Sequence, residues 1–157
     1  MNFLIRLESL DNALGRLLDW LRSPALLAAR IYIASVFLPS GWLKYRSWES
    51  TLDLFRNEYH VPLLPPDIAA YVGTFGELFF PSLLLLGLFG RFSALAASAV
   101  NAMAVIAYAH VLFSEGFEAA IGQHLLWAVL LATLAVFGPG TFSLDALLRR
   151  GWKKQHP

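Results

Sequence analysis

Residues 24–44 read PALLAARIYIASVFLPSGWLK, and this stretch decides the fold because it is apolar over the length of a membrane span yet contains a charged residue. The hydrocarbon core of a bilayer is about 30 Å thick, and about 20 apolar residues cross it as a helix. Three further apolar stretches of similar length follow at residues 68–88, 92–113 and 121–137. A charged side chain inside a span, such as that of Arg30, normally faces the interior of a helix bundle. The sequence therefore predicts an all-α fold, a transmembrane four-helix bundle with a polar interior.

The composition fits a single membrane domain over residues 1–157. Hydrophobic residues make up 57% of the chain and charged residues only 15%, whereas an average soluble domain contains about 25% charged residues. The net charge of +1 gives no reason to expect a nucleic-acid partner. The chain has no cysteine, which excludes disulfide chemistry, thiolate metal ligands and cysteine nucleophiles.

The segment before the first span, residues 1–22, predicts an amphipathic helix that lies on the membrane surface. Leucines recur there at helical spacing among charged side chains, a pattern typical of interfacial helices: Leu7, Leu10, Leu14, Leu17 and Leu21. A helix packed on a soluble partner is the alternative. We expect the spanning helix itself to begin at Pro24, since proline is favoured in the first turn of a helix.

The distribution of Lys and Arg outside the spans predicts the orientation, because the cytoplasmic side of a membrane protein carries the excess of these residues. An even number of spans places both termini on one side. That side carries eight basic residues: Arg6, Arg16, Arg22, Arg91, Arg149, Arg150, Lys153 and Lys154. The other side carries three: Lys44, Arg46 and Arg56. We therefore expect both termini, and with them the tail of residues 138–157, in the cytoplasm.

Polar side chains within the spans are predicted to form two layers, judged from a rise of about 1.5 Å per helical residue. The central layer contains Arg30, Glu77 and Asn101. A lone buried charge is costly, so we expect Glu77 to be buried and paired, with Arg30 or with Asn101. Such a pair could serve only to fix the helix register. Glu77 could instead carry a proton or accept a hydrogen bond from a ligand, since burial and a nearby arginine shift a carboxylate pKa in opposite directions.

The outer layer contains Lys44, His110 and His124, and His60 could join it. The candidate ligand pocket combines Lys44, His110 and His124 with Tyr108 and Trp127, which lie about one helical turn below the histidines. A neutral histidine can donate or accept a hydrogen bond near pH 7, which suits proton exchange with a quinone-like ring, and the aromatic side chains could stack on that ring. Anchoring at the membrane interface is the alternative role for each polar residue. A metal site formed by His60, His110 and His124 would need all three imidazoles to converge. No residue is assigned a catalytic role.

An ordered set of short motifs resembles the DoxX family of small four-helix bacterial membrane proteins. The set comprises Arg30, Ser40-Gly41-Trp42-Leu43-Lys44, Gly76-Glu77, Gly87-Leu88-Phe89-Gly90-Arg91, Gly138-Pro139-Gly140 and Ser143-Leu144-Asp145. The resemblance covers about residues 26–148 and implies a multi-pass protein of the bacterial plasma (inner) membrane with a redox-associated role. Relatives include the membrane subunit of a thiosulfate:quinone oxidoreductase. The resemblance marks Arg30, Gly41, Lys44 and Glu77 as motif positions and gives none of them a reaction.

Three functions remain open from the sequence. The first is a quinone-linked redox membrane subunit. The sequence shows no redox centre of its own and firmly implies no cofactor, a quinone being the one candidate, so electrons would arrive from a bound flavin, a metal or a partner redox subunit. The second is a membrane anchor or assembly subunit without catalysis, whose amphipathic ends dock a soluble partner. The third is a pathway for small solutes or protons, which in a chain of 17.4 kDa would call for a homo-oligomer.

Overall fold

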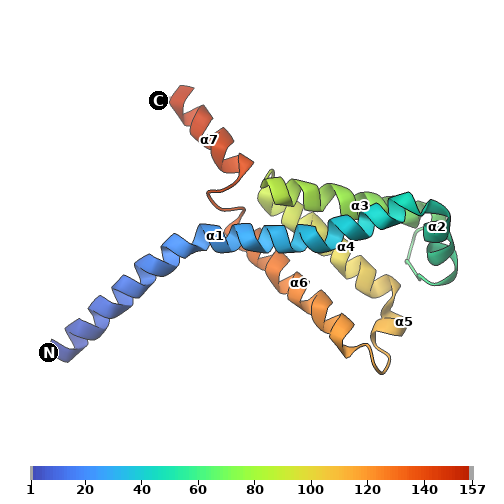
Figure 1. The fold of residues 1–157 in the computed structure, drawn as a ribbon, viewed down its shortest axis with the longest axis horizontal. Coiled ribbons are helices and arrows are strands. Elements are labelled where there is room, and N and C mark those ends of the chain that lie inside the picture. Colours follow the sequence, from blue (N-terminus) through green and yellow to red (C-terminus); the bar gives the residue numbers. More distant parts are fainter. Residues whose placement is uncertain (1, 156–157) are drawn as a thin grey trace.

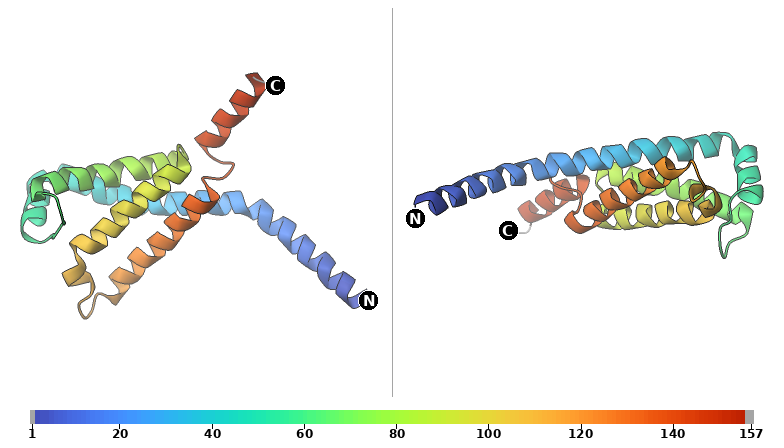
Figure 2. Two further views of the ribbon diagram at one scale, coloured as in Figure 1. Left: turned by 180° about the vertical axis from the view of Figure 1, so that it is seen from behind. Right: turned by 90° about the horizontal axis from the view of Figure 1, so that it is seen from below.

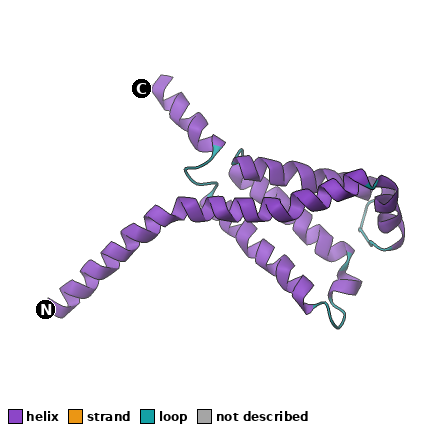
Figure 3. Ribbon diagram, in the orientation of Figure 1, coloured by secondary structure: helices purple, strands orange, loops and turns teal. Residues whose placement is uncertain are grey.

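The computed structural model describes the backbone of residues 2–155 and the side chains of residues 6–152. Within this range the chain contains helices and no strand, and Figure 3 shows loops only as links between helices. The helices are α1 (Asn2–Arg46), α2 (Trp48–Asn57), α3 (Pro66–Leu86), α4 (Gly90–Ala107), α5 (Ala109–Leu112), α6 (Glu118–Phe137) and α7 (Leu144–Gln155). Four of them, α1, α3, α4 and α6, are long and apolar enough to cross a membrane. The predicted all-α fold with four candidate spans is confirmed.

Helix α1 runs without interruption from the N-terminal segment into the first span. The predicted start of this spanning helix at Pro24 is wrong, because Pro24 lies inside α1. A proline within a helix removes one backbone hydrogen bond and bends the helix without having to end it. Figure 1 shows the N-terminal part of α1 bending away from the other helices. The amphipathic segment is therefore a helical extension of the first span and not a separate helix.

Helix α4 ends at Ala107 rather than at the predicted residue 113. Tyr108 leaves helical geometry with φ −115° and ψ 21°, and the single turn α5 follows. The backbone N–H of His60 donates a hydrogen bond of 2.8 Å to the carbonyl of Ala107. The loop between α2 and α3 thus donates to the Ala107 carbonyl, which would accept from within the helix if α4 continued. The third span is therefore shorter than the apolar stretch that predicted it.

The four spanning helices pack in the order α1, α3, α4 and α6, and α6 also touches α1. Their shared core consists of Leu26, Ile33, Phe37, Leu84, Ala94, Ala97, Leu131 and Leu134. Ala94 and Ala97 of α4 have no exposed surface, and such small residues let membrane helices approach closely.

The two ends of the bundle differ. Figure 2 shows that the N-terminal part of α1 and helix α7 both leave the bundle at one end, which we call the inner end after the predicted orientation. The outer end carries α2 and α5, as Figure 1 shows. Helix α2 packs on the outer turns of α3, where Phe55 is buried against Ala69 and Ala70. Because α2 covers these turns, α3 continues outward alongside it.

Candidate functional site

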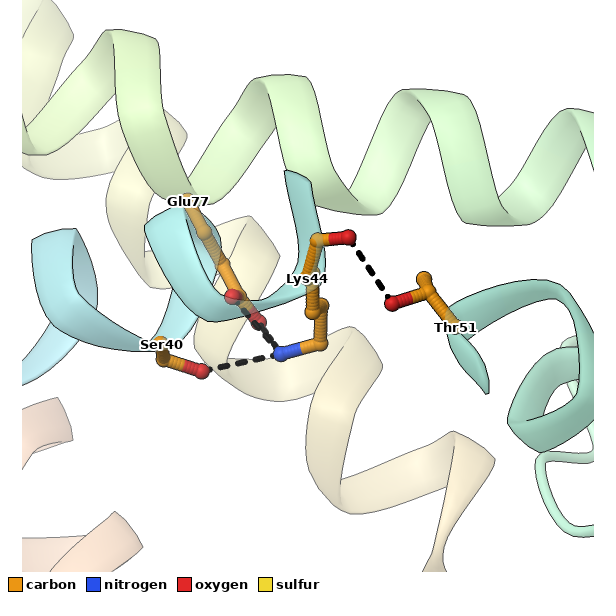
Figure 4. A network of polar contacts seen from close by, with 4 residues as sticks. All are labelled: Ser40, Lys44, Thr51 and Glu77. Atoms are coloured by element: carbon orange, nitrogen blue, oxygen red, sulfur yellow. Dashed lines mark hydrogen bonds and ion pairs between the residues drawn. The ribbon is translucent and has the colours of Figure 1, made fainter. Parts of the chain in front are cut away.

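Lys44 and Glu77 form an ion pair between α1 and α3, shown in Figure 4. The Lys44 Nζ lies 2.9 Å from Oε1 and 2.7 Å from Oε2 of Glu77. It also donates a hydrogen bond of 2.9 Å to the Oγ of Ser40, one turn earlier on α1. Thr51 Oγ1 donates to the carbonyl of Lys44 at 3.0 Å and so ties α2 to the end of α1. The side chains of the pair are only 15% and 13% exposed, and all three ammonium protons have acceptors.

The expected pairing of Glu77 with Arg30 or Asn101 is wrong, because span ends are a poor guide to the levels of residues in neighbouring helices. Gly41 packs directly on α3. A Cβ atom on Gly41 would lie 2.9 Å from a side-chain carbon of Leu78 and 3.0 Å from the Cβ of Glu77. Glu77 is therefore level with the part of α1 that precedes Lys44 by one turn. The first half of α3 extends beyond this level, alongside α2.

Arg30 lies instead at the inner end, where its guanidinium donates to four backbone carbonyls. Nε bonds to the oxygen of Leu84 at 2.8 Å, and Nη2 bonds to that of Leu85 at 2.5 Å. Nη1 lies 2.7 Å from the oxygens of both Pro139 and Phe142. These acceptors belong to the C-terminal end of α3, where the helix dipole favours a cation, and to the turn after α6. Arg30 is 1% exposed, and its contacts hold α1, α3 and the end of α6 together.

Asn101 is paired with His124 across α4 and α6. The Asn101 Oδ1 lies 2.8 Å from the His124 Nδ1, and the Asn101 Nδ2 donates to the His124 carbonyl at 3.1 Å. With Nδ2 acting as the donor, Oδ1 must accept, which places the histidine proton on Nδ1 and leaves Nε2 of the neutral ring as an acceptor. The expected separation of these two residues into a central and an outer layer is wrong, because α4 ends early and its Asn101 is level with His124.

His110 lies apart from this group. Its Nδ1 is 3.3 Å from the Nδ1 of His60, and both side chains are exposed at the outer end. The suggested metal site of His60, His110 and His124 does not form, since His124 is engaged by Asn101. Among the described residues no group of three or more His, Cys, Asp or Glu side chains could hold a metal ion.

A cavity of about 740 Å³ opens beside the ion pair. Side chains of α1, α2, α3, α4 and α6 and of the loop after α2 line it, and most of them are apolar. Four residues of the predicted pocket line this cavity: Lys44, Tyr108, His124 and Trp127. The fifth, His110, does not. Small-molecule sites commonly have volumes of about 300–1,000 Å³ and mostly apolar walls with a few polar groups, so the cavity has the size and character of a ligand site.

Aromatic rings surround the cavity at several levels. The Trp127 ring packs edge-on against both Phe37, at 5.5 Å between centroids, and His124, at 4.7 Å. Tyr59 and Tyr108 form a further edge-on pair at 5.2 Å toward the outer end. The Trp127 Nε1 is buried without a hydrogen-bond partner among the described residues. A donor left unpaired in this way is costly, and because the atom has almost no accessible surface, a ligand could reach it only if the ring turned.

Three polar residues that line the cavity were not among those predicted for the pocket. Ser40 precedes Lys44 by four residues, and this helical spacing could have identified it. Glu77 was expected to be part of a separate layer. Tyr59 lies in the loop after α2, and no sequence pattern marked it as buried. Burial raises the pKa of the Tyr59 phenol, and the Glu77 carboxylate raises it further, so the phenol stays neutral and keeps its hydroxyl donor.

The comparisons with known proteins agree with the motif pattern. The family model described as DoxX matches residues 25–111. A protein of Haemophilus influenzae, described as uncharacterized, is 30% identical over 131 residues, which cover 80% of this chain and 84% of the relative. No solved structure gives a significant match. The matched residues include all of α2 and α3 and the two side chains of the ion pair.

Proposed function

Because the chain belongs to the DoxX family and carries four apolar helices of spanning length, it is an integral membrane protein, and we propose that it is the quinone-binding membrane subunit of a redox system. The proposal rests on one observation: the cavity of about 740 Å³ combines mostly apolar and aromatic walls with a buried ion pair. A quinone reaches its binding site through the lipid phase and presents an aromatic ring with two polar oxygens. These features match such a cavity.

The polar groups of the cavity suit both oxygens of the ring. On one side Ser40, Lys44 and Glu77 form a hydrogen-bonded cluster. The Ser40 hydroxyl only accepts from Lys44 there, so its own proton is available to a ligand carbonyl. On the other side Nε2 of a neutral His124 is an acceptor, and the Trp127 indole N–H is a buried donor without a partner that could reach a ligand only after a turn of its ring. A carbonyl of the quinone and a hydroxyl of the reduced quinol therefore both find partners.

A proton can pass from Lys44 to Glu77 through their 2.7 Å contact, and the neutral amine so formed can take the proton of a bound quinol oxygen, so that the net proton ends on the Glu77 carboxyl group. Electrons must pass to or from a partner redox protein or a separate bound cofactor, because none of these side chains carries them. We assign the chain the binding and proton-handling part of the reaction and leave electron supply to the partner.

The experiment is to purify the protein in a mild detergent, extract it, and measure the quinone retained per protein. We expect wild type to retain quinone, and the double variant Lys44→Met with Glu77→Gln to bind at least about tenfold more weakly, since it removes charge-assisted contacts to the ligand. The matched control is Arg56→Gln with Asp67→Asn, which removes an ion pair of the same 2.7 Å length at the exposed surface of α2 and α3. Equal loss in both double variants, or no quinone in wild type, would contradict the proposal.

The anchor or assembly subunit stays as the second candidate, and one observation favours it. The N-terminal part of α1 projects from the bundle with an exposed row of leucines: Leu7, Leu10, Leu14, Leu17 and Leu21. If the purified protein carries no quinone but co-purifies with a defined soluble subunit that is lost on deletion of residues 2–20, this second function replaces the first.

A further inference from the structure

A second cavity, of about 530 Å³, lies at the inner end of the bundle. It is formed by the turn between α3 and α4, the end of α6 with the turn that follows, and the first turns of α7. Figure 1 shows these segments meeting where the spanning helices end. The cavity therefore sits at the level where a membrane helix passes from acyl chains to lipid headgroups. It is separate from the ion pair of Lys44, which does not line it.

Arginines from three helices surround this inner cavity. Arg91 of α4 and Arg149 of α7 line it. Arg22 of α1 lies over the ring of Phe137, another lining residue, with its Cζ 5.0 Å from the ring centroid. The ion pairs found among the described side chains involve Lys44 and Arg56, so none of the three guanidiniums is held by a carboxylate. Guanidinium N–H groups of these arginines are therefore available to bind an anion.

Among the described side chains, one carboxylate lines the inner cavity, and it is already engaged. Asp145 accepts hydrogen bonds from the backbone N–H groups of Phe89, at 2.9 Å, and Gly90, at 2.8 Å, and so caps the start of α4. Arg149 donates its Nε to the Asp145 backbone carbonyl at 3.1 Å, which leaves the other guanidinium N–H groups of Arg149 available. Arg91 lies in the first turn of α4, where the helix dipole disfavours a cation. An anion bound beside Arg91 would offset that unfavourable placement.

Apolar rings form the rest of the rim. Phe89, Phe92 and Phe137 are 63%, 60% and 51% exposed, and they stand at the ends of α4 and α6. Where a spanning helix ends at the membrane surface, rings in this position would face lipid chains and the guanidiniums would stand near the phosphates. A planar guanidinium binds phosphate oxygens through paired hydrogen bonds. We propose that this inner cavity is a binding site for an anionic phospholipid, with its phosphate between Arg91 and Arg149 and its acyl chains along the phenylalanines.

The test uses native mass spectrometry of the full chain in detergent, titrated with phosphatidylglycerol, with phosphatidylcholine of the same acyl chains, and with inorganic phosphate. We expect one phosphatidylglycerol to bind more tightly than phosphatidylcholine. Arg91→Gln and Arg149→Gln should each weaken its binding about tenfold, because each loses a hydrogen bond between charged groups. Arg150→Gln is the matched control: it removes the same charge from the neighbouring residue of α7, which does not line the cavity. Its effect should stay within about twofold, since an isolated exposed charge contributes little.

Three results would overturn the proposal. Equal losses for Arg149→Gln and Arg150→Gln would mean that overall charge, not this cavity, attracts the lipid. Equal binding of the two phospholipids would remove the role of the net negative headgroup. Displacement of the bound lipid by inorganic phosphate would assign the arginines to a free anion. All three arginine variants replace exposed side chains, so unchanged helical content and melting temperature should accompany each measurement.

Discussion

The ion pair of Lys44 and Glu77 should show strong energetic coupling, and this can be measured with Lys44→Met, Glu77→Gln and the double variant. Both replacements are close to the native side chains in length, so they remove charge with little change in volume. The two side chains are 15% and 13% exposed, which means that most of their solvation by water or headgroups has been lost. Each charge therefore depends on its partner.

The expected size follows from that burial. Removing one partner leaves an uncompensated buried charge, which costs about 3–5 kcal/mol of the free energy of unfolding. The double variant leaves no charge behind, so it should cost no more than either single variant. If the two single costs were additive, the double variant would lose about 6–10 kcal/mol. The difference gives a coupling energy of about 3 kcal/mol or more.

The assay is reversible unfolding of the purified protein in mixed micelles, with helical content followed by circular dichroism as the fraction of denaturing detergent rises. The control cycle combines Glu77→Gln with Arg30→Gln, which probes the pairing that the sequence suggested. Arg30 and Glu77 share no hydrogen-bond partner, so their costs should add within about 0.5 kcal/mol. Additive costs for Lys44 and Glu77, or strong coupling of Arg30 to Glu77, would refute the reasoning.

Three further outcomes are expected. Gly41→Ala should lower the free energy of unfolding by about 1–3 kcal/mol, because its Cβ would lie 2.9 Å from a side-chain carbon of α3 in a packed contact. The control Gly122→Ala meets no atom within 4 Å and should not destabilise α6. Thermal melting of the two variants checks this. Arg30→Met should be less stable than Arg30→Gln by about 2 kcal/mol or more, since methionine offers the buried carbonyls no donor; a reversed order in detergent unfolding would contradict it. Reporter fusions at Pro157 and within residues 46–60 should report cytoplasm and periplasm respectively, and a periplasmic signal from Pro157 would overturn the orientation.

The helices were predictable from the sequence because span length and apolar content depend on local composition. Where a helix ends depends on contacts made by distant parts of the chain. The early end of α4 involves the hydrogen bond from His60 to Ala107, and the outward extension of α3 depends on the packing of Phe55. Neither contact leaves a pattern in the sequence of the helix it alters.

The candidate site was predictable in residue type but not in pairing. Lys44, His124 and Trp127 could be selected because polar and aromatic side chains at similar depth tend to face one interior. The partner of Glu77 could not be selected, because an error of two helical turns in the estimated level of Glu77, about 11 Å, is enough to place Arg30 rather than Lys44 beside it. Gly41 indicates the correct level of Glu77, because a glycine between Ser40 and Lys44 on the helix surface marks where α3 approaches α1 most closely.

The polar cluster around Arg30 and the one around Lys44 differ in how many of their hydrogen-bonding groups are already paired. This difference indicates a structural role for the first cluster and a ligand-binding role for the second. At the inner end Arg30 donates to four backbone carbonyls at once, so a ligand could gain access to it only by breaking these contacts with the ends of α3 and α6. In the outer half Trp127 Nε1 has no partner within the described chain, and Lys44 donates its protons to two side chains, Ser40 and Glu77, rather than to backbone carbonyls. A ligand in the neighbouring cavity can bind these groups by small side-chain shifts alone. An empty cavity and an unpaired indole donor both cost free energy of folding, so selection for stability alone would fill the cavity with a larger side chain and remove the donor. The cavity and the unpaired donor lie together beside a buried ion pair, and this is the reason to look for the ligand there.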